Sequence, residues 1–354
     1  MNVINIENRK IGEGQPVFII AEVSANHGQD FGRAIELIKK AKECGADAVK
    51  FQTYTPDTMT LNSDNKLFKV NHPEWGGQTL YELYEKAYTP WEWFKDLKKA
   101  ADDCGLLFFS TAYDKSSVDF LEELGVTVHK VASFELVDLP LIRYMARTGT
   151  PIIVSTGMST LPEINDAVRA VKKAGGKEMA LLKCVSSYPA LPEEMNLKTI
   201  PDMKKRFKCP IGLSDHTLGT GVSVASICLG AKIIEKHFTL SRELKGPDSF
   251  FSIEPGELRE LVKNIRVVEQ SLGKVHYGLT KKEEQSRVFR RSLFVVKDIK
   301  KGEVFTEENV RSIRPAGGIV PKYLGKILGA VSRADIKKGT PIDWQMIDKK
   351  PKRR

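Results

Sequence analysis

The chain has 354 residues, of which 41% are hydrophobic and 28% are charged, and its formal net charge is +10. This composition is typical of a globular protein large enough for a barrel and a smaller unit, and no apolar run approaches the roughly 18–20 residues of a membrane-spanning helix. The first ten residues lack the apolar core and cleavage site of a signal peptide, so we expect a cytoplasmic protein.

The first two-thirds of the chain repeat one pattern, a short apolar run rich in β-branched residues followed by a helical stretch. The apolar runs cover residues 17–24, 48–53, 106–111, 128–133, 151–156, 180–186, 210–216 and 232–238. The helical stretches include residues 32–44, 91–104, 116–124, 161–174, 196–207 and 222–229. Eight strands alternating with helices predict a closed parallel (β/α)8 TIM barrel, whose catalytic groups lie where the strands end.

Other segments complete the barrel. Residues 2–16 predict a short strand and turn that plugs its bottom. Residues 55–90, after the second strand, form a connection long enough to favour a lid or a substrate wall, and residues 239–253 form a second long segment after the last strand. Residues 255–272 predict the final amphipathic helix, which ends near Gly273.

The chain beyond the barrel differs in charge and pattern. We divide the chain into a barrel domain at residues 1–273, a linker at 274–286 and a small β-rich domain at 287–354. From Gln285 onward there are 18 Lys and Arg against 7 Asp and Glu, an excess of +11. Because no recognition-helix pattern accompanies this charge, we expect an anionic small substrate, no nucleic acid, and a solvated tail at 349–354. The repeated Asp-Ile-Lys-Lys-Gly at 298–302 and 335–339 predicts internal pseudo-symmetry.

The cysteines are odd in number and form no Cys-x-x-Cys pair. We expect buried, reduced thiols, as in a cytoplasmic protein. The five are Cys44, Cys104, Cys184, Cys209 and Cys228.

Two histidines, His216 and His237, close consecutive predicted strands. Because side chains alternate along a strand, Ser214 lies on the side of His216, and Glu235 lies on the side of His237. Two imidazoles at neighbouring strand ends suit one divalent metal with positions open for water and substrate. Alternatively, each is a core or capping histidine with a satisfied hydrogen bond.

Lys50 and Lys130 end the second and fourth strands, where a lysine is costly to bury without an anion. They predict a phosphate or carboxylate ligand. The alternative is that the apolar part of each lysine side chain is buried and its ammonium group reaches solvent at the rim of the barrel. Glu22 and Glu135 follow strands one and four, and could accept a proton or pair with a lysine. The hydroxyl groups suited to donate to a phosphate are those of Thr111, Ser133, Ser155 and Ser214.

Five ordered segments resemble the sialic acid synthase family. They are Phe-Ile-Ile-Ala-Glu-Val-Ser-Ala-Asn-His (18–27), Ala-Asp-Ala-Val-Lys-Phe-Gln-Thr (46–53), Ser-Thr-Gly-Met (155–158), Ser-Asp-His-Thr-Leu-Gly (214–219) and Ile-Glu-Lys-His-Phe-Thr (234–239). Residues 287–344 resemble the antifreeze-like (SAF) domain that follows the barrel in this family. The resemblance therefore covers essentially the whole chain and implies a TIM barrel with a small β-rich SAF domain.

Within the family, the chain resembles the branch of pseudaminic acid synthases. The markers are Ser-Ala-Asn-His (24–27), Tyr-Thr-Pro-Asp-Thr (54–58), Leu-Tyr-Glu-Leu-Tyr (80–84) and Ser-Phe-Glu (133–135). This branch implies condensation of phosphoenolpyruvate with 2,4-diacetamido-2,4,6-trideoxy-L-altrose and water, releasing phosphate by C–O cleavage. The alternatives are an N-acetylneuraminate or legionaminic acid synthase with the same chemistry, or more remotely a non-catalytic sugar-binding barrel.

The resemblance also implies roles for matching residues. His216 and His237 would ligate a divalent metal, Mn²⁺ in preference to Mg²⁺ or Co²⁺, and Glu22 and Glu135 would border the reacting carbons. Arg314 would reach the sugar of the neighbouring subunit, because the family is a domain-swapped homodimer. Phosphoenolpyruvate would be held by Lys50, Lys130, Ser133, Ser155 and Ser214. The residues expected near the sugar are Ser186, where some neuraminate synthases carry Asn, Tyr188 and Asp248.

Overall fold

The computed structural model describes residues 3–71, 75–244 and 246–348, and the chain forms two compact units, of which the first ends at Gly273. Parts of both predicted mouth segments (72–74 and Lys245) and the predicted tail at 349–354 lie outside the described residues. Within the described ranges, no helix has both the length and the apolar composition needed to cross a membrane.

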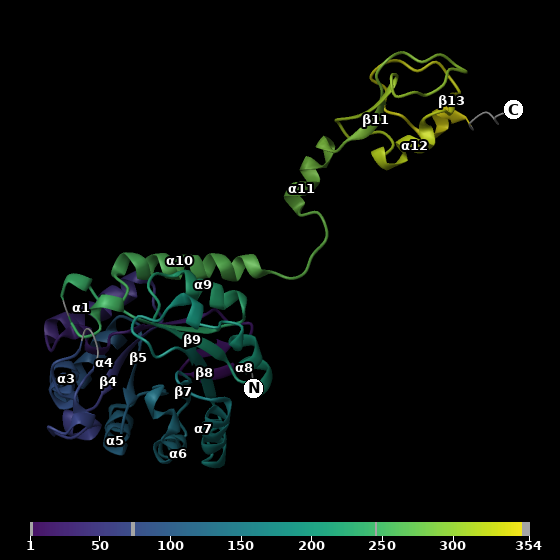
Figure 1. Ribbon diagram of the computed structural model, residues 1–354. Coiled ribbons are helices and arrows are strands. Elements are labelled where there is room, and N and C mark those ends of the chain that lie inside the picture. Colours follow the sequence, from purple (N-terminus) through teal and green to yellow (C-terminus); the bar gives the residue numbers. More distant parts are fainter. Residues whose placement is uncertain (1–2, 72–74, 245, 349–354) are drawn as a thin grey trace. The chain divides into compact units, whose positions relative to one another are not determined.

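The first unit is a closed barrel of eight parallel strands, which confirms the predicted TIM barrel (Figure 1). Around the barrel the strands follow one another in chain order, and the last pairs with the first. The strands are β3 Phe18–Glu22, β4 Ala48–Thr53, β5 Leu107–Ala112, β6 His129–Val131, β7 Ile152–Ser155, β8 Met179–Cys184, β9 Ile211–Asp215 and β10 Ile233–His237.

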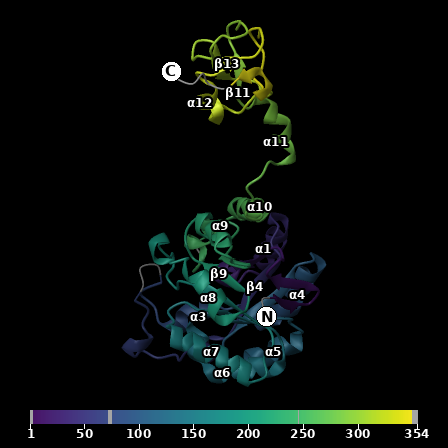
Figure 2. The same ribbon diagram turned by 90° about the vertical axis from the view of Figure 1, so that its right-hand side faces the viewer.

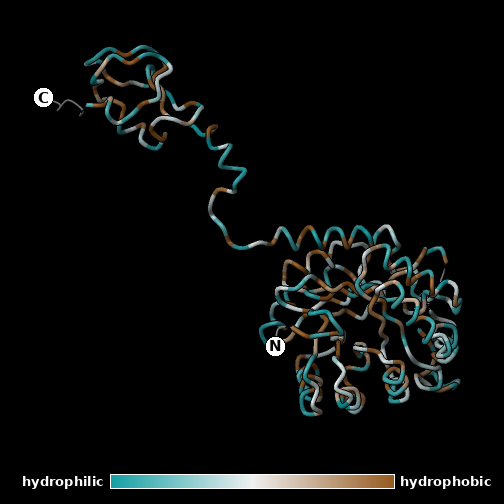
Figure 3. Tube along the Cα trace, turned by 180° about the vertical axis from the view of Figure 1, so that it is seen from behind, coloured by the Kyte–Doolittle hydropathy of each residue, from teal (hydrophilic) through white to brown (hydrophobic). Residues whose placement is uncertain are grey.

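Helices surround these strands (Figure 2), and hydropathy alternates along the outermost, α10 (Figure 3). The helices are α1 Phe31–Cys44, α4 Phe94–Asp103, α5 Lys115–Leu124, α6 Leu139–Thr148, α7 Leu161–Lys173, α8 Thr199–Phe207, α9 Gly221–Cys228 and α10 Pro255–Leu272. The sequence reasoning did not name α6. Its buried Leu141, Ile142 and Met145 nevertheless have helical spacing, and the Asp138 side chain caps its first turn.

Side-chain alternation divides each strand between two cores. In β3, Ile19 and Ala21 pack against the helices, whereas Phe18 and Ile20 join an apolar cluster inside the barrel. Glu22 continues the inward row, and the other strands follow the same rule. The barrel interior is therefore apolar where strands begin and polar where they end.

A hairpin plugs the apolar end of the barrel, as predicted. Strands β1 (Val3–Ile6) and β2 (Arg9–Gly12) pair antiparallel. Their buried Ile4, Ile6 and Ile11 belong to the same cluster as the inward residues at the starts of the barrel strands.

The insertion after β4 has helical structure of its own. It contains α2 (Pro56–Met59) and α3 (Leu80–Ala87), and a capping box of Thr79 and Glu82 begins α3. The family marker at residues 80–84 therefore lies in the first part of α3. The segment after β10 contains short 3₁₀ turns at Arg242–Leu244 and Ser249–Phe251.

The second unit is small and rich in short strands. Its buried core includes Leu293, Phe305 and Ile336. Within the predicted linker lies a short helix, α11. The elements are α11 Lys281–Ser286, β11 Ser292–Val295, β12 Val310–Ile313, α12 Leu324–Ile327, β13 Val331–Ser332 and β14 Ile347–Asp348.

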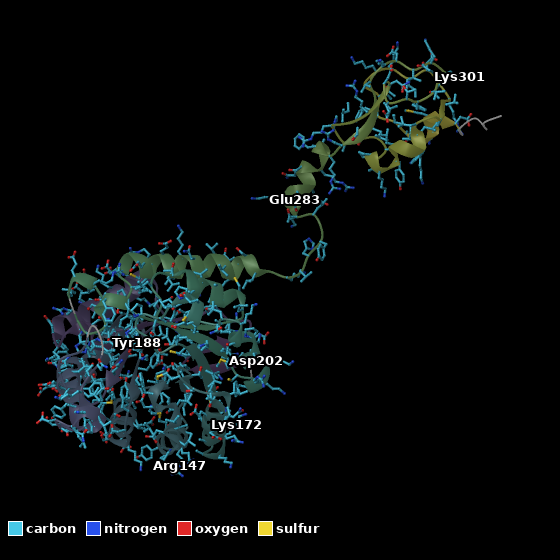
Figure 4. All side chains as sticks on the ribbon, viewed as in Figure 1. Arg147, Lys172, Tyr188, Asp202, Glu283 and Lys301 are labelled. Carbon is cyan, nitrogen blue, oxygen red and sulfur yellow. The ribbon has the colours of Figure 1, made fainter. Side chains whose placement is uncertain are left out.

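The two copies of the Asp-Ile-Lys-Lys-Gly segment, at 298–302 and 335–339, form hydrogen bonds with each other. The Asp298 carboxylate accepts hydrogen bonds from the backbone of Lys338 and the side chain of Lys337, both at 2.8 Å. In return, Asp335 accepts from the backbone of Lys301 at 2.8 Å and the side chain of Lys300 at 3.0 Å. Lys301 is labelled in Figure 4. These reciprocal contacts confirm the predicted pseudo-symmetry.

The prediction of buried cysteines is wrong for two of the five. Cys104 is half-buried at the end of α4, and Cys228 is exposed at the end of α9. In α9 the inward face is taken by Ser223, Ser226 and Ile227, so the next residue points outward. An apolar run does not show which side of a helix meets solvent.

Candidate active site

A cavity of about 580 Å³ opens at the carboxyl ends of the barrel strands. Figure 4 shows Tyr188 within the barrel unit, while Arg147, Lys172 and Asp202 lie at its periphery. Most of the predicted site residues line this cavity. They are Glu22, Lys50, Thr111, Lys130, Ser133, Glu135, Ser155, Tyr188, Ser214, His216, His237 and Asp248.

Strand register explains why residues so distant in sequence meet. Glu22 of β3 is the Cα partner of both His237 in β10 and Lys50 in β4. On the other side of β10, Glu235 is the partner of Ser214. Inward residues at the same level of adjacent strands become neighbours across the barrel interior.

The two predicted lysines are buried, which excludes the alternative that they reach the rim. Lys50 is 3% exposed and Lys130 is 1% exposed. The Lys50 ammonium lies 2.7 Å from a Glu22 carboxylate oxygen and donates to the Thr111 hydroxyl at 3.0 Å. Lys130 donates to the Ser155 hydroxyl at 2.7 Å. Two of the four predicted hydroxyl groups, those of Thr111 and Ser155, therefore bind the lysines directly.

Glu235 connects the two lysines, and the sequence reasoning did not place it in the site. Its carboxylate oxygens lie 3.8 Å from the Nζ atoms of Lys50 and Lys130. It also accepts a hydrogen bond from Ser214 at 2.9 Å. Its position two residues before His237, on the same side of the strand, was the signal that could have identified it.

Burial and charge act against each other in this network. Burial alone would raise the pKa of Glu235, but Lys130 and Lys50 hold it below its usual value. Burial raises the pKa of Glu22 to about 7, even though Lys50 counteracts it. Burial lowers the pKa of Lys130 in spite of Glu235. Binding of an anionic ligand would therefore change the pKa values and the protonation states of this cluster.

Glu135 is an isolated carboxylate in the cavity wall. One of its oxygens is buried and has no hydrogen-bond partner. Burial raises its pKa to about 7. A carboxyl group that titrates near neutrality can act as an acid, a base or a negative charge at working pH.

Ser133 and Ser186 meet at Gly157. The Ser133 hydroxyl accepts a hydrogen bond from the Gly157 backbone at 3.0 Å. A Cβ atom at Gly157 would lie 2.2 Å from the Ser186 hydroxyl oxygen and 2.7 Å from that of Ser133. Only glycine therefore allows both serines to approach this turn.

The imidazoles of His216 and His237 lie together, with ring centroids 5.3 Å apart. His216 Nδ1 is 2.8 Å from the Val185 carbonyl oxygen, to which it donates, so the neutral ring has its lone pair on Nε2. His237 Nδ1 is buried without a hydrogen-bond partner and lies 3.8 Å from an Asp248 oxygen. Two imidazoles with available nitrogens fit an open divalent-metal site.

Among the described residues, no third protein ligand completes such a site. In the described part of the chain, no three His, Cys, Asp or Glu side chains converge closely enough to hold a metal ion. A metal here would take its remaining ligands from water and substrate, as open catalytic sites do.

A hydrogen-bonded chain links Glu22 to Asp248 and was not predicted. Gln52 donates to Glu22 at 3.1 Å and to the Ser24 hydroxyl at 2.7 Å. Ser24 in turn donates to Asp248. Its backbone φ of +46° is unusual for a residue other than glycine and marks a constrained position.

Trp75 joins the two mouth segments. Its indole nitrogen donates to the Pro247 carbonyl at 2.7 Å. Its ring lies 5.9 Å from that of Tyr188, which in turn lies 4.4 Å from the ring of His216. The predicted lid or substrate wall is therefore connected to the histidine pair through the adjacent rings of Trp75 and Tyr188.

Arg314 belongs to the second unit. It follows β12 and is exposed. Its expected role in a partner's site remains a prediction.

Comparisons with known proteins agree with this geometry. The pattern of the NeuB family matches residues 37–277, and that of the SAF domain matches residues 290–348. The chain belongs to the NeuB family. The predicted resemblance to sialic acid synthases and the SAF domain are thereby confirmed.

Individual relatives cover nearly the whole chain. A pseudaminic acid synthase of Campylobacter jejuni is 44% identical over 92% of this chain and 95% of its own. An N,N'-diacetyllegionaminic acid synthase of Legionella pneumophila is 37% identical over 96% of this chain and 99% of its own. The crystal structure of an N-acetylneuraminic acid synthetase from Leptospira borgpetersenii superposes with a TM-score of 0.72 and 34% identity, covering 80% of this chain and 94% of its own. These three relatives are named as a synthase of pseudaminic acid, a synthase of N,N'-diacetyllegionaminic acid and a synthetase of N-acetylneuraminic acid.

Proposed function

We propose that this protein is a pseudaminic acid synthase, a transferase that joins phosphoenolpyruvate to 2,4-diacetamido-2,4,6-trideoxy-L-altrose with water and releases phosphate. The main support is the buried lysine pair, Lys50 and Lys130, with its hydroxyl partners at the floor of the cavity. The 44% identity to a pseudaminic acid synthase over 92% of the chain favours this branch.

Phosphoenolpyruvate would be bound by the cavity floor. Its phosphate and carboxylate would replace Glu22 and Glu235 as the anions nearest the two ammonium groups. Ser133, Ser155 and Ser214 would donate to its oxygens. These contacts would hold the enol carbon C3 toward the sugar aldehyde and stabilise the charge that leaves with phosphate.

The reaction needs an anion near C2 of phosphoenolpyruvate. When C3 forms the new bond to the aldehyde carbon, positive charge develops at C2. The Glu135 carboxylate, which has one buried oxygen without a hydrogen-bond partner, is our first candidate to stabilise it. Water then adds at C2, and the tetrahedral intermediate collapses with cleavage of the C–O bond to phosphate.

We further propose that His216 and His237 hold a divalent metal, Mn²⁺ in preference to Mg²⁺ or Co²⁺. When bound, it supplies a Lewis acid for the aldehyde oxygen. The support is the pair of available imidazole nitrogens and the bare Nδ1 of His237. Tyr188, Asp248 and Ser186 would border the sugar.

We also propose a homodimer in which Arg314 of one subunit reaches the sugar in its partner's cavity. The basic excess after residue 284 supports an anionic substrate for this region.

The test is phosphate release, with product mass, across three sugars, the precursors of pseudaminic, legionaminic and N-acetylneuraminic acids. Turnover efficiency should be highest with the pseudaminic precursor. A preference for another sugar would show that the protein is the synthase of the corresponding acid, with the same chemistry. Failure to release phosphate with any sugar would contradict a synthase.

A further inference from the structure

One side of the cavity differs in chemistry from its polar floor. The apolar wall, formed by Met59, Val70, Leu80, Leu83 and Ala87, comes entirely from the insertion after β4. The floor carries the lysine and carboxylate network, so the cavity combines a polar floor with an apolar wall. A ligand that fills it should have the same division.

The wall is a preformed surface. In α3, Leu80, Leu83 and Ala87 share the helix face that lines the cavity, whereas Glu82, Glu85 and Lys86 are exposed.

The helix that carries the wall is held in place at several points. The Tyr84 ring packs on that of Tyr54 with centroids 5.5 Å apart, and Gln29 donates to the Glu85 carbonyl at 2.8 Å. The four larger residues of the wall are only half-buried without a ligand. A helix anchored this way with a partly open apolar face suits a substrate that brings methyl groups.

We propose that the apolar wall makes the protein select a 6-deoxy, diacetamido sugar over hydroxylated amino sugars. This inference rests on the proposed function and concerns the distal end of its sugar. The reacting aldehyde must lie near the polar floor, so the far end of the sugar extends toward the mouth. That end of the proposed substrate carries the C6 methyl and the C4 acetamido methyl. A hydroxyl group at C6 would lose contact with water against Leu80 and Leu83, and these side chains offer it no hydrogen bond in return.

The probe is a pair of sugars that differ by one oxygen, 2,4-diacetamido-2,4,6-trideoxy-L-altrose and 2,4-diacetamido-2,4-dideoxy-L-altrose. An apolar pocket discriminates against an added hydroxyl by roughly 10- to 100-fold in kcat/KM, which is the wild-type preference we expect. In Leu80→Asn or Leu83→Asn this ratio should fall by about tenfold, with the KM for phosphoenolpyruvate unchanged. Leu83→Met should keep the ratio.

Leu67→Asn is the matched control. Leu67 belongs to the same insertion but is 84% exposed and does not line the cavity. Thermal unfolding shows whether each variant is folded, and Leu80, in the first turn of α3, provides the second test if Leu83→Asn unfolds. An unchanged ratio in a folded Asn variant would overturn the wall's role while leaving the synthase intact. If wild type used neither sugar, the proposed function and this inference would both fail.

Discussion

At the scale of single residues, the buried charges of the cavity floor compensate one another. Lys50 has Glu22 at 2.7 Å and Glu235 at 3.8 Å, and Lys130 shares Glu235. Removing one charge therefore also leaves a buried carboxylate without its counter-ion. Changes here should therefore weaken binding of the anionic substrate and also lower the stability of the fold.

The first prediction concerns these lysines. Lys50→Met or Lys130→Met deletes a desolvated anion contact, which should cost on the order of 2–4 kcal/mol, or roughly 30- to 1000-fold in kcat/KM for phosphoenolpyruvate. Steady-state kinetics measures this, with Lys173→Met on the exposed side of α7 as control. An effect limited to the KM of the sugar would show that the lysines do not bind phosphoenolpyruvate.

The second prediction concerns pH. Burial raises the pKa of Glu135 to about 7, and that of Glu22 also to about 7. If the charged form of Glu135 stabilises the cation at C2, kcat/KM should fall as pH is lowered through about 7, because Glu135 becomes neutral. Glu135→Gln should lower the rate above that pH and make the acid limb shallower, leaving the contribution of Glu22. A Gln variant with the wild-type profile would rule out this role.

The third prediction concerns the metal. Chelation should abolish activity, and Mn²⁺ should restore it. His216→Ala and His237→Ala should lose most bound metal, measured by elemental analysis, while their circular dichroism stays native. His276→Ala, at an exposed position, is the control. Full turnover in metal-free protein would refute the proposal.

At the scale of elements, strands β9 and β10 carry the proposed metal ligands on one side and a buried ion pair on the other. Asp215 and Lys236 immediately precede the two histidines, but they point outward. The Lys236 ammonium donates to Asp215 at 3.0 Å, and Asp215 also accepts from Ser223 of α9. The pair ties the ends of both strands to each other and to a helix.

The fourth prediction follows from this burial. Lys236→Met should leave Asp215 buried without a counter-charge and lower the free energy of unfolding by about 3–5 kcal/mol. Denaturant unfolding measures the loss. Lys99→Met removes an exposed ion pair with Asp103 and should leave stability unchanged. Equal stability of the two variants would show that the buried pair is dispensable.

At the scale of the whole molecule, the proposed dimer predicts that Arg314 of one subunit completes the cavity of its partner. The fifth prediction mixes two inactive proteins, His237→Ala and Arg314→Ala, under conditions that allow subunit exchange. If Arg314 enters the partner's cavity, each mixed dimer has one doubly damaged site and one intact site. Activity should then return toward about a quarter of wild type, as expected for random mixing of dimers. No recovery after verified exchange would place Arg314 within its own chain's site or outside any site.

The sequence by itself determined the barrel, the polar character of its carboxyl end and many of the residues that line the cavity there. Strand periodicity is local, so the repeated pattern of strand and helix indicated that Lys50, His216 and His237, each at a strand end, lie at the carboxyl end of the barrel. The same reasoning identified the hairpin plug and the pseudo-symmetric second unit.

Only the tertiary structure decided which of these groups touch. Glu235 bridges both lysines, and Gln52 and Ser24 connect Glu22 with Asp248, because parallel register and barrel closure bring distant strands to the same level. Burial was equally inaccessible from local pattern, as exposed Cys228 shows. The apolar wall depends on where α3 lies over the cavity. Side-chain periodicity is set by neighbours in sequence, whereas contacts and desolvation are set by neighbours in space.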